Sequence, residues 1–154
     1  MVESYSLIML LDRVYMDIID KLQQVFVELN STNTHLLDEI YTTDMKFEDP
    51  AHIVEGLDDF KKYIKNLYQN VTSCTFNFIK IERFSGGAVL EWNMLISHPR
   101  LNKGIIFTVS GVSVVRYDDK IYSHRDYFDL GGMLYERLPL IGCIIKFIKT
   151  NLGK

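Results

Sequence analysis

His124 and Asp126 are the residues of this sequence whose types and spacing best suit proton transfer. They lie in HRDYFDLGG (residues 124–132), where polar and apolar residues alternate as in a β-strand. Because successive strand residues point to opposite faces, His124, Asp126 and Phe128 share one face. A carboxylate fixes the tautomer of a neighbouring imidazole, and such a pair can exchange a proton with a ligand. The alternative role is structural, with Asp126 accepting hydrogen bonds from a neighbouring strand or loop.

Asp49 is a second candidate acid. It lies at the end of a short strand predicted for DMKFEDP (residues 44–50), which Pro50 terminates. A carboxylate placed among apolar residues can serve as a general base. The alternative role for Asp49 is to support the turn that begins at Pro50.

The run AVLEWNMLIS (residues 88–97) supplies candidate ligand contacts. Alternation places Trp92 on one face and Glu91 and Asn93 on the other, and either face could line a cavity. Trp92, the only tryptophan, serves either as core packing or as a platform for a ligand. Glu91 and Asn93 are polar residues in an apolar strand, so we expect one of them to supply a polar group to a pocket.

Composition favours a packed globular domain. The 154 residues are 47% hydrophobic, and the net charge of −3 with scattered Lys and Arg argues against nucleic-acid binding. Two distant cysteines, Cys74 and Cys143, and four histidines lack metal-ligand spacing, and no phosphate-cradling loop occurs. We therefore expect no metal and no organic cofactor.

Two apolar runs bear on location. SLIMLL (residues 6–11) has no basic segment before it, so we expect no secretory signal and a cytoplasmic protein. LPLIGCII (residues 138–145) falls short of the roughly 20 residues that span a bilayer.

Periodicity predicts an α+β domain that spans residues 1–154. Apolar residues at steps of three and four predict helices over about 4–30 and 57–71, and Asn33 can cap a short helix between them. A period of two then predicts an antiparallel meander, with strands at residues 74–84, 88–97, 105–117 and 120–129.

A helical extension follows at residues 132–154. We expect Asp129 to cap its start, since it precedes Gly131 and Gly132. The segment LPLIGCIIKFIKTNLGK is apolar around most of its circumference, which favours a helix that closes over the sheet or the pocket mouth. A dimer contact is the next interpretation, and association with a membrane surface is the least favoured.

Three motifs resemble the nuclear transport factor 2-like superfamily over roughly residues 16–130. They are LLDEIYTTDMKFEDP (36–50), VEGLDDFKKYI (54–64) and GVSVVRYDDKIYSHRDYFDLG (111–131), in this order. The superfamily includes SnoaL-type polyketide cyclases, ketosteroid isomerases and limonene epoxide hydrolases. The resemblance implies a cone-shaped curved antiparallel sheet, wrapped by N-terminal helices around an apolar cavity. It also implies that Asp49, like the isomerase base, and Asp126, like an aspartate of the hydrolase triad, face this cavity.

This sequence lacks catalytic residues of two of these enzyme groups, which limits the reactions that it could catalyse. The tyrosine and aspartate of the isomerase oxyanion hole are replaced here by Phe26 and Ser113, so an enolate would lack donors. The Arg and Asp partners of the hydrolase triad are absent from Glu91–Met94. SnoaL-type acid–base chemistry in an apolar cavity remains compatible with the sequence.

These observations predict a SnoaL-like small-molecule pocket protein. It would act as a cofactor-independent isomerase, cyclase or hydrolase on an apolar oxygenated compound, or alternatively as a non-catalytic ligand-binding or dimerisation module. We expect a homodimer whose partner is a small apolar molecule, not nucleic acid or a membrane. The candidate catalytic residues are Asp126, Asp49 and His124, and the candidate substrate contacts are Trp92, Asn93, Glu91, Phe26 and Phe128.

Overall fold

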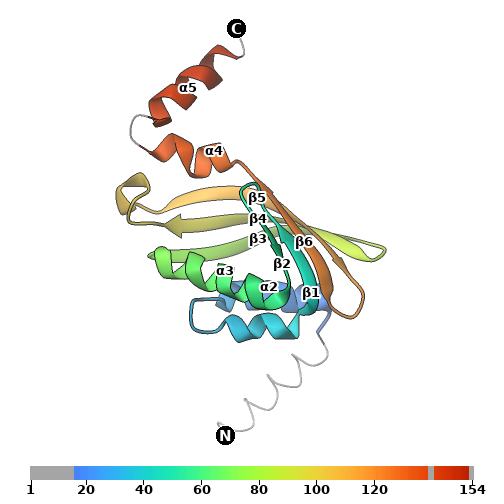
Figure 1. Cartoon of the computed structure of the whole chain (residues 1–154). Helices are drawn as coiled ribbons and strands as arrows, with labels where there is room; N and C mark the ends of the chain where they lie inside the picture. Colours follow the sequence, from blue (N-terminus) through green and yellow to red (C-terminus); the bar gives the residue numbers. More distant parts are fainter. Residues whose placement is uncertain (1–15, 139–140, 153–154) are drawn as a thin grey trace, which may run out of the picture.

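A curved six-stranded sheet with helices on its concave side forms the body of the protein (Figure 1). The computed structural model describes residues 16–138 and 141–152. The strands are β1 (Tyr41–Glu48), β2 (Ile53–Glu55), β3 (Ser73–Phe84), β4 (Gly87–Ser97), β5 (Phe107–Tyr117) and β6 (Ile121–Phe128). The helical segments are α2 (Ile18–Glu28), η1 (Thr34–Glu39), α3 (Leu57–Asn70), η2 (Asn102–Gly104), α4 (Leu130–Met133), η3 (Tyr135–Arg137) and α5 (Ile141–Asn151). The predicted α+β class and curved sheet are confirmed.

The strand order is β2-β1-β6-β5-β4-β3. The meander from β3 to β6 is antiparallel throughout, as predicted, whereas β1 pairs with β6 in parallel, with Phe47 opposite His124. This pairing places the end of β1, and therefore Asp49, beside the end of β6 that carries Asp126. Strand β2 was not predicted, because three residues are too few to show an alternating pattern.

Helix α2 packs on the sheet through its apolar face. The Asp17 carboxylate caps the helix by accepting a hydrogen bond from Ile19 N at 2.8 Å, and Ile19, Leu22 and Val25 are buried. The predicted first helix is confirmed over Ile18–Glu28, but it begins after the Asp17 cap and does not run through residues 16 and 17, and residues 4–15 lie outside the described residues.

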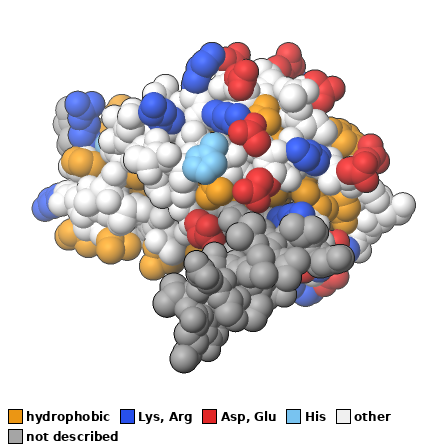
Figure 2. Space-filling model, turned by 90° about the horizontal axis from the view of Figure 1, so that it is seen from below, with side chains coloured by type: hydrophobic (Ala, Val, Ile, Leu, Met, Phe, Trp, Pro, Cys, Tyr) orange, Lys and Arg blue, Asp and Glu red, His pale blue; other side chains and the backbone are white. Residues whose placement is uncertain are grey.

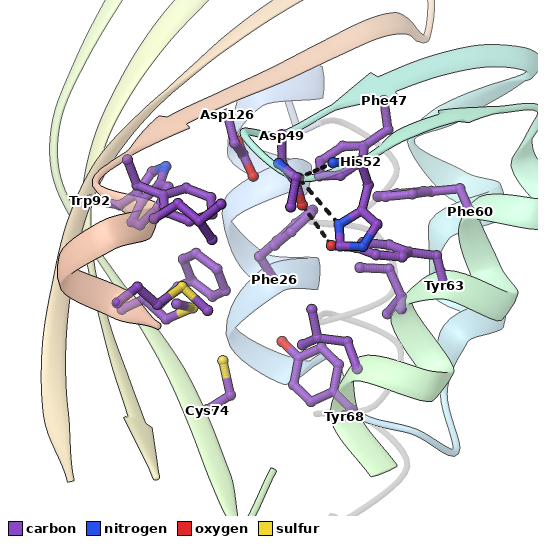
Figure 3. A pocket seen from close by; sticks show the side chains of 18 of the residues that line it. Phe26, Phe47, Asp49, His52, Phe60, Tyr63, Tyr68, Cys74, Trp92 and Asp126 are labelled. Atoms are coloured by element: carbon purple, nitrogen blue, oxygen red, sulfur yellow. Dashed lines mark hydrogen bonds and ion pairs between the residues drawn. The ribbon is translucent and has the colours of Figure 1, made fainter. Parts of the chain in front are cut away.

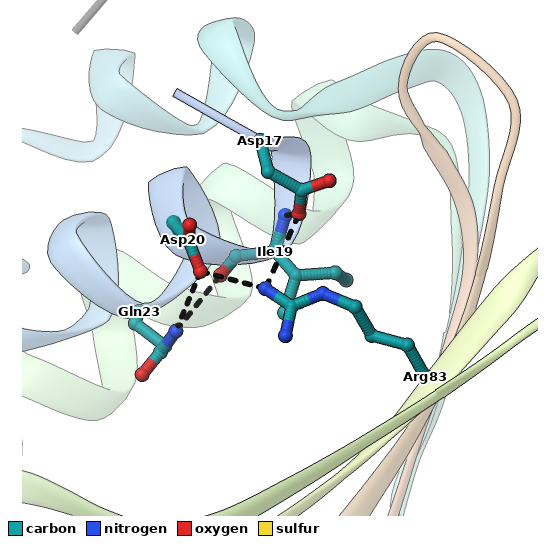
Figure 4. A network of polar contacts seen from close by, with 5 residues as sticks. All are labelled: Asp17, Ile19, Asp20, Gln23 and Arg83. Carbon is teal, nitrogen blue, oxygen red and sulfur yellow. Dashed lines mark hydrogen bonds and ion pairs between the residues drawn. The ribbon is translucent and has the colours of Figure 1, made fainter. Parts of the chain in front are cut away.

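A polar contact joins the same helix to β3 (Figure 4). Arg83 Nη2 lies 2.7 Å from Asp20 Oδ1 and 3.5 Å from Asp17 Oδ1. All three side chains are about half exposed, so this network contributes at most about 1 kcal/mol. Apolar burial, and not the network, holds α2 on the sheet.

Two hydrophobic clusters fill the concave side. The first lies among α2, α3 and β1 and contains the largest buried aromatic residues of that region, Tyr41 and Phe60. The second is built around Trp92, Met94 and Ile96 of β4. Between the two clusters lies the cavity described below.

Gly111 of β5 gives the Trp92 ring room to lie flat against the sheet. A Cβ atom at this position would overlap the six-membered ring of Trp92, which is 2% exposed. We expect Gly111→Ala to lower the free energy of unfolding by about 1–3 kcal/mol through overpacking. Urea unfolding checks this, with Thr108→Ala on the exposed side of β5 as the control. Equal stability of the two variants would contradict the packing argument.

The C-terminal segment divides into two parts. Asp129 caps α4, as predicted, by accepting a hydrogen bond from Gly132 N at 2.9 Å. Helix α5 instead projects away from the sheet (Figure 1). Five apolar side chains of α5 and of the residue that follows it are exposed, namely Ile141, Ile144, Phe147, Ile148 and Leu152. The expectation that this helix closes over the sheet or the pocket mouth is therefore wrong, because its polar side makes the contacts with the body.

Charge is evenly mixed on the face opposite α5. Figure 2 shows Lys and Arg side chains interspersed with Asp and Glu on that face. Among the described residues, no helix has the length and apolar character needed to cross a membrane.

Candidate functional site

A cavity of about 200 Å³ lies between the concave face of the sheet and helices α2, α3 and α4 (Figure 3). Most of its lining is aromatic or aliphatic. Phe26 comes from α2, Phe60 and Ile64 from α3, and Trp92 and Met94 from β4. Besides the indole of Trp92 and the thiol of Cys74, the lining side chains with polar atoms are Asp49, His52, Tyr63, Tyr68 and Asp126. Such a cavity suits a mostly apolar ligand that presents few polar groups.

Asp126 is held by two donors on one carboxylate oxygen. Ser113 Oγ donates to Asp126 Oδ1 at 2.5 Å, and His124 Nε2 lies 2.9 Å from the same oxygen. Ser113 in turn accepts a hydrogen bond from Trp92 Nε1 at 2.8 Å. Both donors bind Oδ1, and no described residue forms a hydrogen bond with Oδ2. The carboxylate is thus fixed in position while one oxygen remains available to a ligand.

Tyr41 determines which nitrogen of His124 carries the proton. Burial, and secondarily the Asp126 charge, raise the pKa of Tyr41 well above its ordinary value of 10.0, so the phenol keeps its proton. The Tyr41 hydroxyl lies 2.5 Å from His124 Nδ1. Asp126 Oδ1 is a carboxylate acceptor, so a neutral imidazole bonded to it carries its N–H group on Nε2, and its Nδ1 then accepts a hydrogen bond from Tyr41. Tyr41 therefore sets the tautomer that lets His124 support the carboxylate.

Asp49 is engaged on both of its oxygens. Its Oδ1 accepts hydrogen bonds from Ala51 N at 2.7 Å and His52 N at 2.6 Å, and Tyr63 donates to its Oδ2 at 2.6 Å. The first two bonds support the turn after Pro50, which was the alternative role predicted for this residue. Burial and the Asp49 hydrogen bond raise the pKa of Tyr63, so Tyr63 keeps its proton and remains the donor.

Tyr68 and Cys74 lie next to each other on the cavity wall (Figure 3). Burial, and then the neighbouring Cys74, raise the pKa of Tyr68, while burial raises the pKa of the Cys74 thiol to about 11. The buried Tyr68 hydroxyl makes no hydrogen bond of standard geometry with a described residue. Its nearest polar neighbour is the Cys74 thiol, with which its titration is coupled.

The structure brings most of the predicted site residues together. Asp126, Asp49, Trp92, Phe26 and Phe128 all line the cavity. His124 is 3% exposed and lies behind Asp126, on the same side of β6 as the predicted alternation requires.

Glu91 and Asn93 lie outside the cavity, which corrects the expectation that one of them supplies it with a polar group. Trp92 and Met94 occupy the concave face of β4, so strand alternation directs their neighbours to the other face. There Glu91 is exposed, and Asn93 Oδ1 accepts a hydrogen bond from Ser110 Oγ at 2.7 Å.

Four polar residues of this region, Tyr41, His52, Tyr63 and Tyr68, were not singled out as site residues from the sequence. Tyr63 follows the apolar period of α3, so it was indistinguishable from a core residue. His52 lies in a turn without a recognisable motif. Tyr41 is separated from His124 by 83 residues, and only the parallel pairing of β1 and β6 brings them together.

A model of the SnoaL-like domain matches residues 22–124 of the chain, from within α2 to His124 of β6. The chain belongs to the SnoaL-like family. This match covers more than half of the sequence and agrees with the nuclear transport factor 2-like resemblance of the three motifs. A search of the curated proteins finds no significant match.

Solved structures share the fold of this SnoaL-like protein at low sequence identity. A Catenulispora acidiphila protein with a ketosteroid isomerase-like fold, in complex with trimethylamine, has a TM-score of 0.69 and 17% identity over 80% of this chain and 94% of its own. A proposed SnoaL-like polyketide cyclase of Jannaschia sp. CCS1 has a TM-score of 0.67 and 12% identity over 76% and 88% of the two chains. Another, of Shewanella putrefaciens CN-32, has a TM-score of 0.64 and 18% identity over 75% and 90%.

Proposed function

We propose that this SnoaL-like protein binds a small apolar compound with a carbonyl or hydroxyl group and transfers a proton to or from it. The observation that carries the proposal is the Asp126 carboxylate on the cavity wall, with Oδ1 fixed by Ser113 and His124. Asp126 then acts as the general base through Oδ2. Isomerisation, cyclisation and hydrolysis all require such a step.

His124 assists without touching the ligand. Its Nε2–H group donates to Asp126 and stabilises the ionised carboxylate, while Tyr41 holds the ring in the required tautomer. His124 and Tyr41 are thus positioning residues for Asp126.

Asp49 participates through Tyr63. The Tyr63 hydroxyl keeps its proton and donates a hydrogen bond to Asp49, so its oxygen can accept a hydrogen bond from a ligand hydroxyl. His52 Nδ1 lies 3.3 Å from Asp49 Oδ1, and its side chain is 56% exposed. Asp49 therefore orients the ligand, and the exposed His52 provides a route for proton exchange with solvent.

A non-catalytic binding function is favoured by one specific observation. Ser113 and Trp92 use their donors within the wall, toward Asp126 and Ser113. These donors are therefore not directed at a ligand oxygen, as an oxyanion hole requires. A protein that stores or carries its ligand needs only the cavity and its few polar groups.

Ligand titration with Trp92 fluorescence tests the proposal, because this single tryptophan lies in the cavity wall. A panel of cyclic ketones, enones and alcohols would be titrated, and each mixture analysed for product by mass spectrometry. Ile64→Phe narrows the cavity and is expected to weaken binding about tenfold, from a strain of roughly 1.4 kcal/mol.

Ile79→Phe is the matched control, since Ile79 is 53% exposed on β3. Binding with product formation supports catalysis, and binding without product supports the non-catalytic alternative. Binding that is equal in Ile64→Phe and Ile79→Phe would show that the cavity is not the site.

A further inference from the structure

Helix α5 attaches to the body through its polar side. Lys149 Nζ lies 3.0 Å from Asp129 Oδ2 and 2.5 Å from Glu136 Oε1, and Gly142 packs against the backbone of Glu136. The apolar side consequently faces solvent, with exposed fractions of 60% for Ile144 and 71% for Phe147. Ile141, Ile148 and Leu152 are exposed on the same helix face. An amphipathic helix of a globular protein normally has the opposite orientation.

The loop between β4 and β5 adds to this surface. Its Ile105 and Ile106 are exposed, and the loop and α5 enclose an open hollow of about 820 Å³. The charged residues of the hollow are Arg100, Lys103, Arg137, Lys146 and Glu136. Glu136 is paired with Lys149, and the Arg137 guanidinium stacks on the Phe107 ring, so Arg100, Lys103 and Lys146 make this end of the molecule basic. The opposite face differs, because there acidic and basic side chains are interspersed (Figure 2).

We propose that α5 and the β4–β5 loop bind the surface of an anionic lipid membrane. The exposed apolar residues enter the boundary between headgroups and acyl chains, and the basic residues of the hollow contact lipid phosphates. With 11 residues and a length of about 16 Å, α5 is too short to cross a bilayer and lies in its plane. The inference goes beyond the proposed function and does not depend on what the cavity binds.

Charge favours a membrane over a second copy of this chain. Two copies joined through this surface would bring the same Arg and Lys side chains together, at an electrostatic cost. An anionic lipid surface has the complementary charge.

Co-sedimentation with vesicles tests the proposal. The full chain is expected to sediment with vesicles of phosphatidylcholine and phosphatidylglycerol, and much less with phosphatidylcholine alone. Replacing Ile144 and Phe147 with serine should reduce binding at least tenfold, whereas Val27→Ser with Ile79→Ser should leave it unchanged. Lys103→Gln and Lys146→Gln should each reduce binding roughly fivefold.

Labelling of Cys143 provides an independent readout. Cys143 is exposed on α5, whereas Cys74 is only partly exposed and the pKa of its thiol is raised to about 11, so a polarity-sensitive fluorophore attaches preferentially to the helix. A blue shift with anionic vesicles supports insertion of α5. Absence of sedimentation with anionic vesicles would overturn the proposal, as would binding that the two serine replacements on α5 do not change. Lipid-free dimers that these replacements dissociate would assign the surface to a second copy instead.

Discussion

Replacing Asp126 with asparagine is expected to lower kcat for a substrate identified by the ligand panel by about 100- to 10,000-fold, the usual contribution of a general base. Asparagine has the same shape, and its carbonyl oxygen can still accept the hydrogen bonds from Ser113 and His124. The variant loses only the basic oxygen that faces the cavity. Binding of the ligand is expected to change far less than kcat.

Stability and a surface control separate this effect from misfolding. Asp126→Asn should change the free energy of unfolding by about 1 kcal/mol, because the neutral acceptor makes weaker hydrogen bonds than the carboxylate. Asp119→Asn, in the exposed turn between β5 and β6, should leave both kcat and stability unchanged. If Asp126→Asn kept full turnover, Asp126 would be a structural residue and the acid–base proposal would be wrong.

Strand alternation predicted part of this site from the sequence. It placed His124 and Asp126 on one face of β6, and the contact between their side chains confirms it. Alternation also placed Trp92 on one face of β4 and Glu91 and Asn93 on the other. It did not identify which of the two faces is concave and lines the cavity. The curvature of the sheet and the helices that cover it decide that question, and both depend on residues far away in the chain.

Contacts between distant segments account for the rest of the site. The Tyr41–His124 contact depends on the parallel pairing of β1 with β6, which leaves no local pattern in either strand. The orientation of α5 was also not predicted from the sequence. Its apolar circumference suggested burial, whereas in the structure Lys149 contacts Asp129 and Glu136 of the body and the apolar side is exposed. Periodicity thus locates an apolar face without identifying what covers it.

Alkaline pH is expected to destabilise the fold strongly. The pKa values of Tyr41, Tyr63 and Tyr68 are raised in the folded protein, mainly by burial, above the ordinary value of 10.0. Above pH 10 the unfolded chain releases protons that the folded protein keeps, so stability is complete below this pH and falls as pH rises. Each tyrosine then costs about 1.4 kcal/mol per pH unit, and the three together cost about 4 kcal/mol at about pH 11.

The Cys74 thiol adds to this loss at slightly lower pH. Its pKa rises from 9.0 to about 11 on folding, so its contribution to stability declines between these two values. The expected loss is about 2 kcal/mol by about pH 11. Urea unfolding followed by Trp92 fluorescence from about pH 7 to pH 11 measures the combined effect, since the midpoint falls with stability.

Tyr68→Phe isolates one tyrosine from the other groups that titrate in this range. Its hydroxyl makes no hydrogen bond of standard geometry with a described residue, so at neutral pH the variant should match the original protein within about 1 kcal/mol. At about pH 11 it should lose about 1.4 kcal/mol less, because phenylalanine has no proton to release. Lysines titrate equally in both proteins, so the difference between the two curves belongs to Tyr68 and the neighbouring Cys74 thiol, whose titration is coupled to it. Parallel curves would mean that solvent reaches this hydroxyl in the folded state, and that the cavity wall is open beside Cys74.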